Sequence, residues 1–293
     1  MVYLIKIKNT WSKLDTSRSR NTYESDKKKF GSFKPNLLQT IMISIGQKTF
    51  LKRGLFRSYY AKIIMSLSSG PLDVVFRGCA FRLWNERNLI EYGILLDPNY
   101  NHEDIDFLVN GAKNNANFVD IGSNIGLYSQ PLALAAPKGQ TISIDANPLM
   151  KLRLNFNSSS SKISNINMIN IAVSDKKGSG SLKIRKDDIA IVALDESIDG
   201  NIKYSTLIEV LSINKIDKIH GLKIDIEGQE DKALVPFLLN APKTLLPNKI
   251  VIEQPTRNQD YPGCLNAFEK LNYKLVGRSK NNSFYELDAY ESK

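Results

Sequence analysis

Four acidic residues in and after the segment LKIDIEGQE have types and spacing that suit proton transfer or metal binding. Lys223, Asp225 and Glu227 alternate along an apolar run, so they share one face of an expected strand, and Glu230 begins the next expected helix. Carboxylates at a strand end could take a proton from a reacting hydroxyl, or could hold Mg²⁺ or Mn²⁺ together with Glu253 on the following strand. The predicted catalytic residues are Asp225, Glu227 and Glu230, and the predicted metal ligands are Asp225, Glu227 and Glu253. For Glu230 the alternative is a helix cap that accepts from backbone N–H groups.

A second segment, FVDIGSNIGLYS, has the composition of a ligand-binding turn between a strand and a helix. Gly122 and Gly126 allow close approach of the backbone to a ligand and conformations that a side chain would forbid. Asp120 adds a fixed negative charge, whereas a loop that binds pyrophosphate relies on exposed N–H groups and a helix N-terminus. The turn therefore predicts a ligand with a cationic end that lacks phosphate.

A third acidic position extends this site. Asp145 ends the apolar run QTISID, 25 residues after Asp120, near the spacing at which an acidic side chain binds ribose hydroxyls. A ligand with both a ribose and an ammonium group fits S-adenosylmethionine better than NAD. The predicted cofactor is S-adenosylmethionine, with Mg²⁺ or Mn²⁺ as an optional second one.

The elements that must position these residues alternate between strand and helix patterns from residue 116 onward. Apolar strand patterns cover residues 116–122, 140–145, 166–175, 220–228 and 248–254, and helical patterns separate most of them. Near-continuous apolar strands that alternate with helices predict a parallel sheet covered on both faces. Residues 271–288 read as an appended antiparallel hairpin. The predicted fold is an α/β, Rossmann-like, doubly wound and mostly parallel sheet, and the resemblance described next implies that it is of the class I methyltransferase type.

The chain resembles the FkbM-type S-adenosylmethionine-dependent methyltransferases in four segments: FVDIGSNIGLYS, SIDANP, NIAVSDKKGSGSL and, above all, LKIDIEGQE. The resemblance covers about residues 72–290. It implies O-methylation of a hydroxyl on a sugar, glycolipid, polysaccharide precursor or specialised metabolite. Two departures are visible: Asp145-Ala146 stands where the family usually has Glu-Pro, and Gln229 stands where many members have His.

The resemblance also implies which residues contact the cofactor. The first segment would hold the methionine part, the acidic end of the second strand the ribose, and the third strand would approach the adenine. The implied cofactor-binding residues are Asp120, Gly122, Ser123, Asn124, Gly126, Asp145, Ala146, Asn147, Asn170 and Ala172.

The N-terminal quarter differs from the rest in charge. Residues 1–70 contain fourteen Lys and Arg against three acidic residues, a net charge of +11, whereas the remainder nets −1. Residues 1–32 are expected to be a solvated, partly disordered leader. Residues 36–67 predict a basic amphipathic helix, or a pair of helices broken near Gly46. Such a helix could pack on the protein's own core, which we favour, or lie on an anionic membrane.

The remaining features limit the alternatives. Cys79 and Cys264 stand far apart without a metal-ligand pattern, which predicts two buried thiols and a cytoplasmic protein, with peripheral membrane contact through residues 36–67 as an option. His220 precedes the fourth strand of the predicted sheet and His102 begins a helix, so neither is expected to be catalytic. The expected organisation is a basic segment at 1–70, a lead-in at 71–115 and the cofactor-binding domain at 116–293. The oligomeric state is left open.

Rival functions remain from other classes. A nicotinamide oxidoreductase would need a catalytic pair such as Tyr-x-x-x-Lys, and the only such spacing, Tyr23 and Lys27, precedes the cofactor strand. An RNA ribose methyltransferase stays open because the leader is basic, although no stripe of aromatic and basic residues accompanies it, and nucleic acid is therefore not the expected partner. A membrane-docked module that binds the cofactor without turnover is the non-enzyme alternative. The expected acceptor is a small molecule or a glycan.

Overall fold

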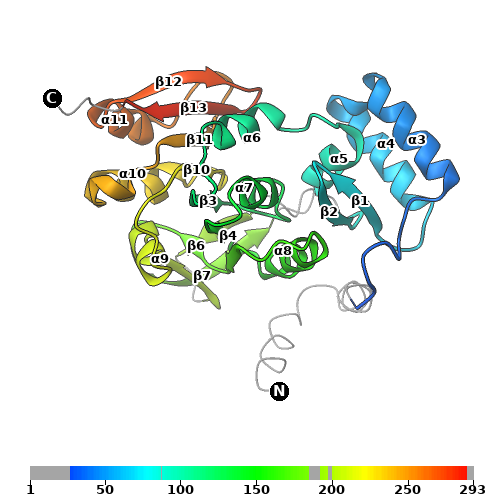
Figure 1. Ribbon diagram of the computed structural model, residues 1–293, viewed down its shortest axis with the longest axis horizontal. Helices are drawn as coiled ribbons and strands as arrows, with labels where there is room; N and C mark the ends of the chain where they lie inside the picture. The colour runs from blue at the N-terminus through cyan, green and yellow to red at the C-terminus, as the bar shows by residue number, and fades with distance from the viewer. Residues whose placement is uncertain (1–26, 87, 185–191, 197–199, 289–293) are drawn as a thin grey trace, which may run out of the picture.

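The computed structural model describes residues 27–86, 88–184, 192–196 and 200–288. Its centre is a seven-stranded sheet in the order β12-β13-β11-β10-β3-β4-β5 (Figure 1). Neighbouring strands pair in parallel from β11 through β5, and only β13 runs against the others, since it is antiparallel to both β11 and β12. The strands are β3 (Phe118–Ile121), β4 (Thr141–Ile144), β5 (Ile166–Ile169), β10 (Gly221–Ile224), β11 (Lys249–Glu253), β12 (Tyr273–Arg278) and β13 (Asn282–Leu287).

When the seven strands are numbered in chain order, their order across the sheet is 3-2-1-4-5-7-6, and strand 7 (β13) is antiparallel to the others. This is the strand order of the class I methyltransferase fold, and it confirms the predicted fold class. The order changes direction between β3 and β10, and ligands of open α/β sheets bind outside the carboxyl ends of the strands at such a switch point. The fold therefore places the segments around residues 120 and 225 side by side.

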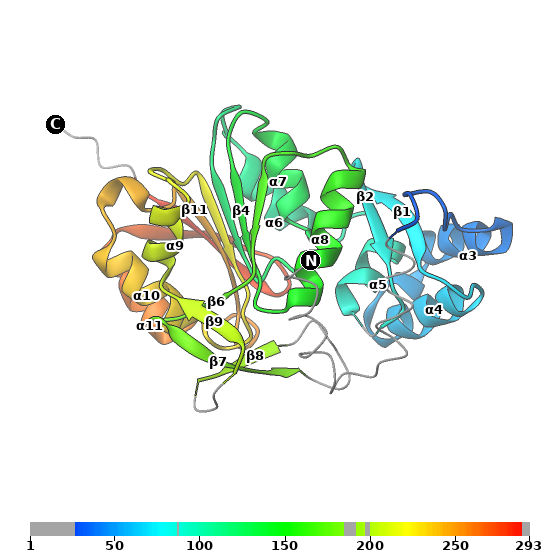
Figure 2. The same ribbon diagram turned by 90° about the horizontal axis from the view of Figure 1, so that it is seen from below.

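Helices cover both faces of this sheet because successive strand residues point to opposite sides. On one face, Val119 and Ile121 of β3 pack in an apolar core with α9 (Leu207–Ile213), α10 (Glu230–Asn240) and α11 (Pro262–Lys270). On the other face, Phe118 packs with α6 (His102–Val109), α7 (Ser129–Ala135) and α8 (Pro148–Ser160). Figure 2 shows the sheet between these two helical layers. A short 3₁₀ turn, η3 (Lys243–Leu245), precedes β11.

A second, four-stranded sheet lies at the carboxyl edge of the first, in the order β6-β9-β7-β8. Its strands are β6 (Ala172–Val173), β7 (Gly178–Ile184), β8 (Val192–Asp195) and β9 (Ile202–Ser205). The single strand expected over residues 166–175 is thus two, β5 and β6, and β6 belongs to this smaller sheet. The polar, glycine-rich sequence of β7 carries no apolar alternation that would have predicted it.

The N-terminal unit consists of α3 (Leu37–Lys48), the 3₁₀ turn η2 (Phe50–Lys52), α4 (Gly54–Ser66), the hairpin of β1 (Leu72–Phe76) and β2 (Cys79–Leu83), and α5 (Leu89–Leu96). Of the two expected arrangements, the structure has the pair of helices, and α3 ends at Lys48, two residues after Gly46. Gly46 is buried inside α3, where a Cβ atom would lie 2.7 Å from Leu96 Cδ2. The glycine therefore lets α3 approach α5 closely instead of ending the helix.

Both helices pack on the protein's own core, since Ala61, Ile64 and Met65 of α4 are buried in the same cluster as α5. The described residues of the expected leader, 27–32, contact the core instead of being fully solvated. Residues 28–33 are held by the buried ion pair of Arg82 and Asp73, because Asp73 accepts from Gly31 N (2.7 Å) and Arg82 donates to Lys28 O (3.0 Å). The rest of the leader, residues 1–26, lies outside the described residues. Within the described ranges no helix is both long enough and apolar enough to cross a bilayer.

Candidate functional site

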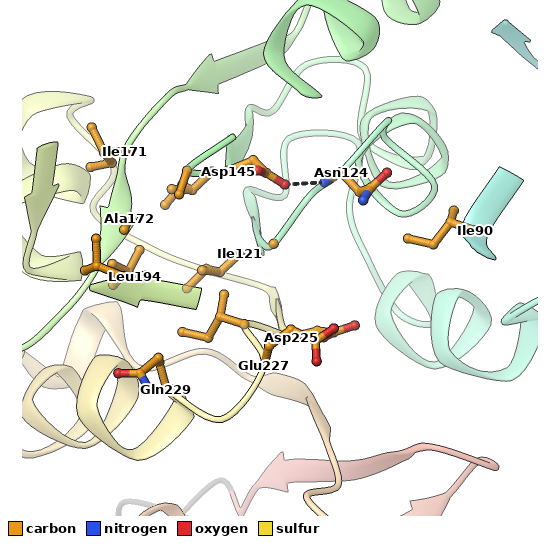
Figure 3. Close-up of a pocket in the computed structure, with 15 residues that line it drawn as sticks. Ile90, Ile121, Asn124, Asp145, Ile171, Ala172, Leu194, Asp225, Glu227 and Gln229 are labelled. Carbon is orange, nitrogen blue, oxygen red and sulfur yellow. Dashed lines mark hydrogen bonds between the residues drawn. The ribbon is translucent and has the colours of Figure 1, made fainter. Parts of the chain in front are cut away.

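A pocket lies at the carboxyl ends of β3, β4 and β10, where the sheet changes direction (Figure 3). One wall is apolar, with Ile171, Ala172 and Leu194 together on one side of the close-up and Asp225 on the other. The polar lining residues are Asn124, Asp145, Asp225, Glu227 and Gln229. The structure thus brings three of the predicted acidic residues to one cavity, Asp145 from the end of β4 and Asp225 and Glu227 from the segment after β10.

The turn after β3 is shaped by contact with the end of β10. Gly122 has φ +78°, and a Cβ atom there would lie 1.9 Å from the carbonyl oxygen of Asp225. Since only glycine fits, the requirement comes from the close approach of two chain segments, which sets Asp225 directly beside the turn. Asn124 follows in a left-handed conformation, with φ +48°, and Asn88 donates to its side-chain oxygen (2.8 Å).

Asp145 is fixed at the pocket by two backbone N–H groups. Its Oδ2 accepts from Asn124 N and its Oδ1 from Asn147 N, both at 2.8 Å, and Figure 3 shows the first of these bonds. Burial raises the pKa of Asp145 to about 6, although these two hydrogen bonds act in the opposite direction. Asn170 does not line the pocket; its side chain donates to the carbonyl oxygens of Asp145 and Ala146 and so holds this strand end in place.

Asp120 lies on the other side of the turn, away from the pocket. It is fully buried, accepts from Ser129 Oγ, and its Oδ1 is 3.8 Å from Lys223 Nζ. Burial raises the pKa of Asp120, and the ammonium of Lys223 opposes this shift. The structure places no part of this carboxylate on the pocket lining, because side chains alternate along β3 and Ile121 takes the pocket side.

Lys223 lies between the buried carboxylate of Asp120 and the pocket carboxylate of Asp225. Its Nζ donates to Gly122 O (3.0 Å) and lies 3.6 Å from Asp225 Oδ2. Burial lowers the pKa of Lys223, but the carboxylates of Asp225 and Asp120 outweigh burial, so the pKa is raised and the side chain stays charged. The strand expected over residues 220–228 ends at Ile224, so the expectation that the three alternating residues share one strand face is wrong: Lys223 lies on β10 and is internal, while Asp225 and Glu227 reach the cavity from the segment after it.

Glu230 supports the loop that carries Glu227. Its two carboxylate oxygens accept from Ile226 N (2.7 Å) and Gly228 N (2.9 Å), and its side chain is buried. The loop needs this support because Glu227 and Gly228 both have positive φ, +58° and +93°. The predicted helix cap is not what these contacts describe, because both donors precede α10 and this helix has no side-chain cap; Glu230 instead holds the loop before the helix.

Glu253 closes the acidic cluster from β11. One ligand atom each from Asp225, Glu230 and Glu253 lie within 4.8 Å of one another, whereas the predicted metal set had Glu227 in place of Glu230. Burial raises the pKa of Glu253 to about 9, aided by the charges of Asp225, Glu227 and Glu230. Glu253 is therefore protonated at neutral pH and donates a hydrogen bond to Asp225.

The other predicted cofactor-binding residues fall into two groups, those that line the pocket and those that do not. Gly122, Asn124, Asp145, Ala146 and Ala172 line the pocket, whereas Ser123, Gly126, Asn147 and Asn170 lie behind it and shape it. His220 packs edge-on against Phe118 at the opposite end of β10, and His102 binds Asn99 O (2.9 Å), so both histidines lie away from the pocket as expected.

Several lining residues have no counterpart in the predicted set. Ile171 and Ile226 neighbour predicted residues, and the apolar character of their segments was visible. Leu194 comes from β8 and Ile90 from α5, two elements distant in sequence from every motif, so the sequence carries no local signal for them.

Comparison with known proteins gives structural similarity only. No protein-family model matches the chain, and no curated protein matches it. Similar solved structures include TYW2 from M. jannaschii in complex with AdoMet, with 15% identity, 75% of this chain and 88% of that chain covered, and a TM-score of 0.39. A SAM-dependent methyltransferase from Agrobacterium tumefaciens shows 10% identity, coverage of 75% and 70%, and a TM-score of 0.46. An rRNA methylase from Streptococcus thermophilus shows 13% identity, coverage of 64% and 95%, and a TM-score of 0.37. The fold assignment itself rests on the strand order.

Proposed function

We propose that the protein is an S-adenosylmethionine-dependent O-methyltransferase. The observation that carries the proposal is the charge of the pocket at the switch point. Asp145, Asp225 and Glu227 line it, and the part of the chain that the structure describes places no lysine or arginine on that lining. Such a pocket repels the pyrophosphate of a dinucleotide and suits a ligand with a cationic centre and free hydroxyls.

Along the sheet edge, the lining residues occur in an order that suits the adenine, ribose and methionine parts of S-adenosylmethionine. The apolar wall of Ile171, Ala172 and Leu194 would hold the adenine, and the carboxylate of Asp145, already oriented by two N–H groups, would accept from ribose hydroxyls. The methionine end would follow the turn at Gly122 toward Asp225. When bound, this cofactor supplies a methyl group on a positively charged sulfur.

Asp225 is the residue proposed to act as general base. Its side chain is 34% exposed at the cavity, between the ammonium of Lys223 and the protonated Glu253. An acceptor hydroxyl beside Asp225 would pass its proton to this carboxylate, while the bound cofactor would supply the methyl group by breaking its methyl–sulfur bond and would leave as the neutral thioether S-adenosylhomocysteine. Lys223 and Glu253 would keep this carboxylate oriented, and are positioning residues in this scheme.

A cation is the alternative to direct base catalysis. Glu230 is a poor ligand because both its oxygens already accept from backbone N–H groups, which leaves Asp225, Glu253 and the nearby Glu227. A metal would also need to displace the proton on Glu253. These contacts favour Asp225 as the base, and removal of metal by EDTA would separate the two schemes: activity lost with EDTA and restored by Mg²⁺ or Mn²⁺ would indicate the metal.

The proposed acceptor is a hydroxyl of a sugar, glycolipid, polysaccharide precursor or specialised metabolite. This choice rests on the four motif segments similar to the FkbM type, of which LKIDIEGQE supplies Asp225 and Glu227. The RNA ribose alternative would have to bring phosphates to an acidic pocket mouth, which is electrostatically unfavourable.

Calorimetric titration tests the proposal directly. S-adenosylhomocysteine should bind to the full chain while NAD does not, and methyl transfer from labelled S-adenosylmethionine should then appear with a glycan or small-molecule acceptor panel. Binding of NAD in preference to S-adenosylhomocysteine would overturn the cofactor assignment. Binding of S-adenosylmethionine without turnover on any acceptor would support the non-enzyme alternative instead.

A further inference from the structure

The surface of α3, η2 and α4 that faces away from the core is unusually apolar for an exposed surface. Leu37, Phe50, Leu55, Phe56 and Tyr59 are between 59% and 86% exposed, and Ile41 is 49% exposed. Most exposed apolar residues of soluble proteins stand singly, whereas these share two short adjoining helices and the turn between them. We call this set, with the exposed lysines and arginine described next, the hairpin face.

The charges on the hairpin face all have one sign. From residue 27 to residue 72 the chain contains nine Lys and Arg and no Asp or Glu. Lys48, Arg53 and Lys62 are exposed on or beside the two helices, and in the described part of the chain none of them forms an ion pair. An apolar surface next to positive charges without ion-pair partners suits a binding partner that is both apolar and anionic.

The inner side of the same helices already has its partner. Gln39 donates to Ile64 O (2.9 Å), Tyr60 donates to Met42 O (3.1 Å), and the guanidinium of Arg57 lies over the Tyr100 ring. The first two contacts join α3 to α4, and Gln47 of α3 donates to Leu95 O of α5 (3.2 Å), so the inner side of the helix pair is already occupied by the protein's own core. Figures 1 and 2 both place the pair at the end of the molecule farthest from α10 and α11.

We propose that the hairpin face docks on an anionic lipid bilayer and lies in its interface. The aliphatic and aromatic side chains would enter the boundary between headgroups and acyl chains, while the lysines and arginine would meet lipid phosphates. The helices, of 12 and 13 residues, are too short to span a bilayer, which agrees with an interfacial position. A second copy of the chain is a poorer occupant, because it would set two faces of the same charge against each other. The proposal does not depend on the reaction proposed above.

Vesicle flotation of the full chain tests this surface. The protein should float with vesicles of phosphatidylglycerol and not with vesicles of phosphatidylcholine. Raising the ionic strength from about 0.1 M to about 1 M shortens the Debye length from about 10 Å to about 3 Å and should weaken binding. Absence of binding to phosphatidylglycerol at low salt would overturn the proposal.

Two triple variants separate the apolar and the charged contributions. Leu37→Ser, Leu55→Ser and Tyr59→Ser together should lower the partition onto phosphatidylglycerol about tenfold or more, because these side chains are exposed and their removal leaves the fold intact. Lys48→Gln, Arg53→Gln and Lys62→Gln together should lower it to a similar extent at low salt only. The control is Ile213→Ser, Leu239→Ser and Val276→Ser, which changes three apolar residues of the sheet domain that are 48% to 72% exposed and should bind as the wild type does.

Three results would reject the bilayer as the occupant. The first is vesicle binding that survives the serine triple variant at an unchanged thermal midpoint. The second is a dimer in light scattering that disappears in the serine triple variant while vesicles do not bind. The third is binding to single-stranded RNA that the glutamine triple variant loses and the serine triple variant keeps.

Discussion

Two sets of carboxylates lie on opposite sides of the turn at Gly122, and their surroundings differ sharply. Beneath the turn, Asp120 is fully buried and compensated by Lys223 and Ser129. In the pocket, Asp145 and Asp225 reach a cavity whose described lining holds no positive side chain. Residues of the same type at neighbouring strand ends thus differ in their surroundings: Asp120 is buried beside a counter-charge, and we propose that the pocket carboxylates are the ones that meet a ligand.

The largest effect is expected on the buried side, from Lys223→Met. This change leaves Asp120 buried without its counter-charge, which should lower the free energy of unfolding by about 3 to 5 kcal/mol. Chemical denaturation would measure it. The double variant Lys223→Met with Asp120→Asn should recover much of the loss, and a single variant as stable as the wild type would show that the buried pair is not what holds this edge.

The pocket side should respond in activity and not in stability. Asp225→Asn keeps the shape but removes basicity, so turnover should fall about a hundredfold while affinity for S-adenosylhomocysteine changes little. Steady-state kinetics on the acceptor gives the result, with the exposed Asp217→Asn as control. Turnover near the wild-type value would remove Asp225 from the mechanism and leave Glu227 as the candidate base.

The raised pKa of Glu253 gives a pH-dependent test of the pocket side. Its pKa is about 9 in the folded protein and near the ordinary glutamate value when unfolded, so the folded state holds an extra proton between these values. Stability from this group is full below the unfolded pKa and is lost as pH rises toward about 9. Glu253→Gln should remove that loss, so the stability of this variant relative to the wild type should rise steadily between pH 5 and 9 (roughly the window set by these two pKa values). If the free energy of unfolding had the same pH dependence in the wild type and the variant, Glu253 would not be protonated in the folded protein.

The sequence anticipated the mostly parallel sheet with its antiparallel hairpin, the turn and the strand-end carboxylates because apolar runs, glycines and acidic ends are local signals. It could not decide which carboxylate faces the cavity, since alternation along a strand gives two faces and does not say which one meets the ligand. Asp120 and Asp145 read alike in sequence, yet only Asp145 lines the pocket.

Contacts between distant segments were also out of reach. The break after Lys48 and the burial of Gly46 depend on how α3 meets α5, and the role of Glu230 depends on two N–H groups exposed by an unusual loop. Leu194 reaches the pocket from the smaller sheet, in which β7 is polar and rich in glycine and the other strands have two to four residues. In each case the deciding physics is a tertiary contact, which no window of sequence contains.

The measurement that tests the central claim most directly is the affinity of S-adenosylhomocysteine for the wild type and for Asp145→Ala, by calorimetry at neutral pH. Loss of a charge-assisted hydrogen bond to ribose should cost about 1.5 kcal/mol, which is about a tenfold weaker affinity. The control Asp145→Asn, which keeps an acceptor for one of the two backbone N–H groups, should show whether the turn or the charge is responsible. Equal affinity in the wild type and both variants would contradict the account, because the pocket carboxylates would then not be the ones that bind the cofactor.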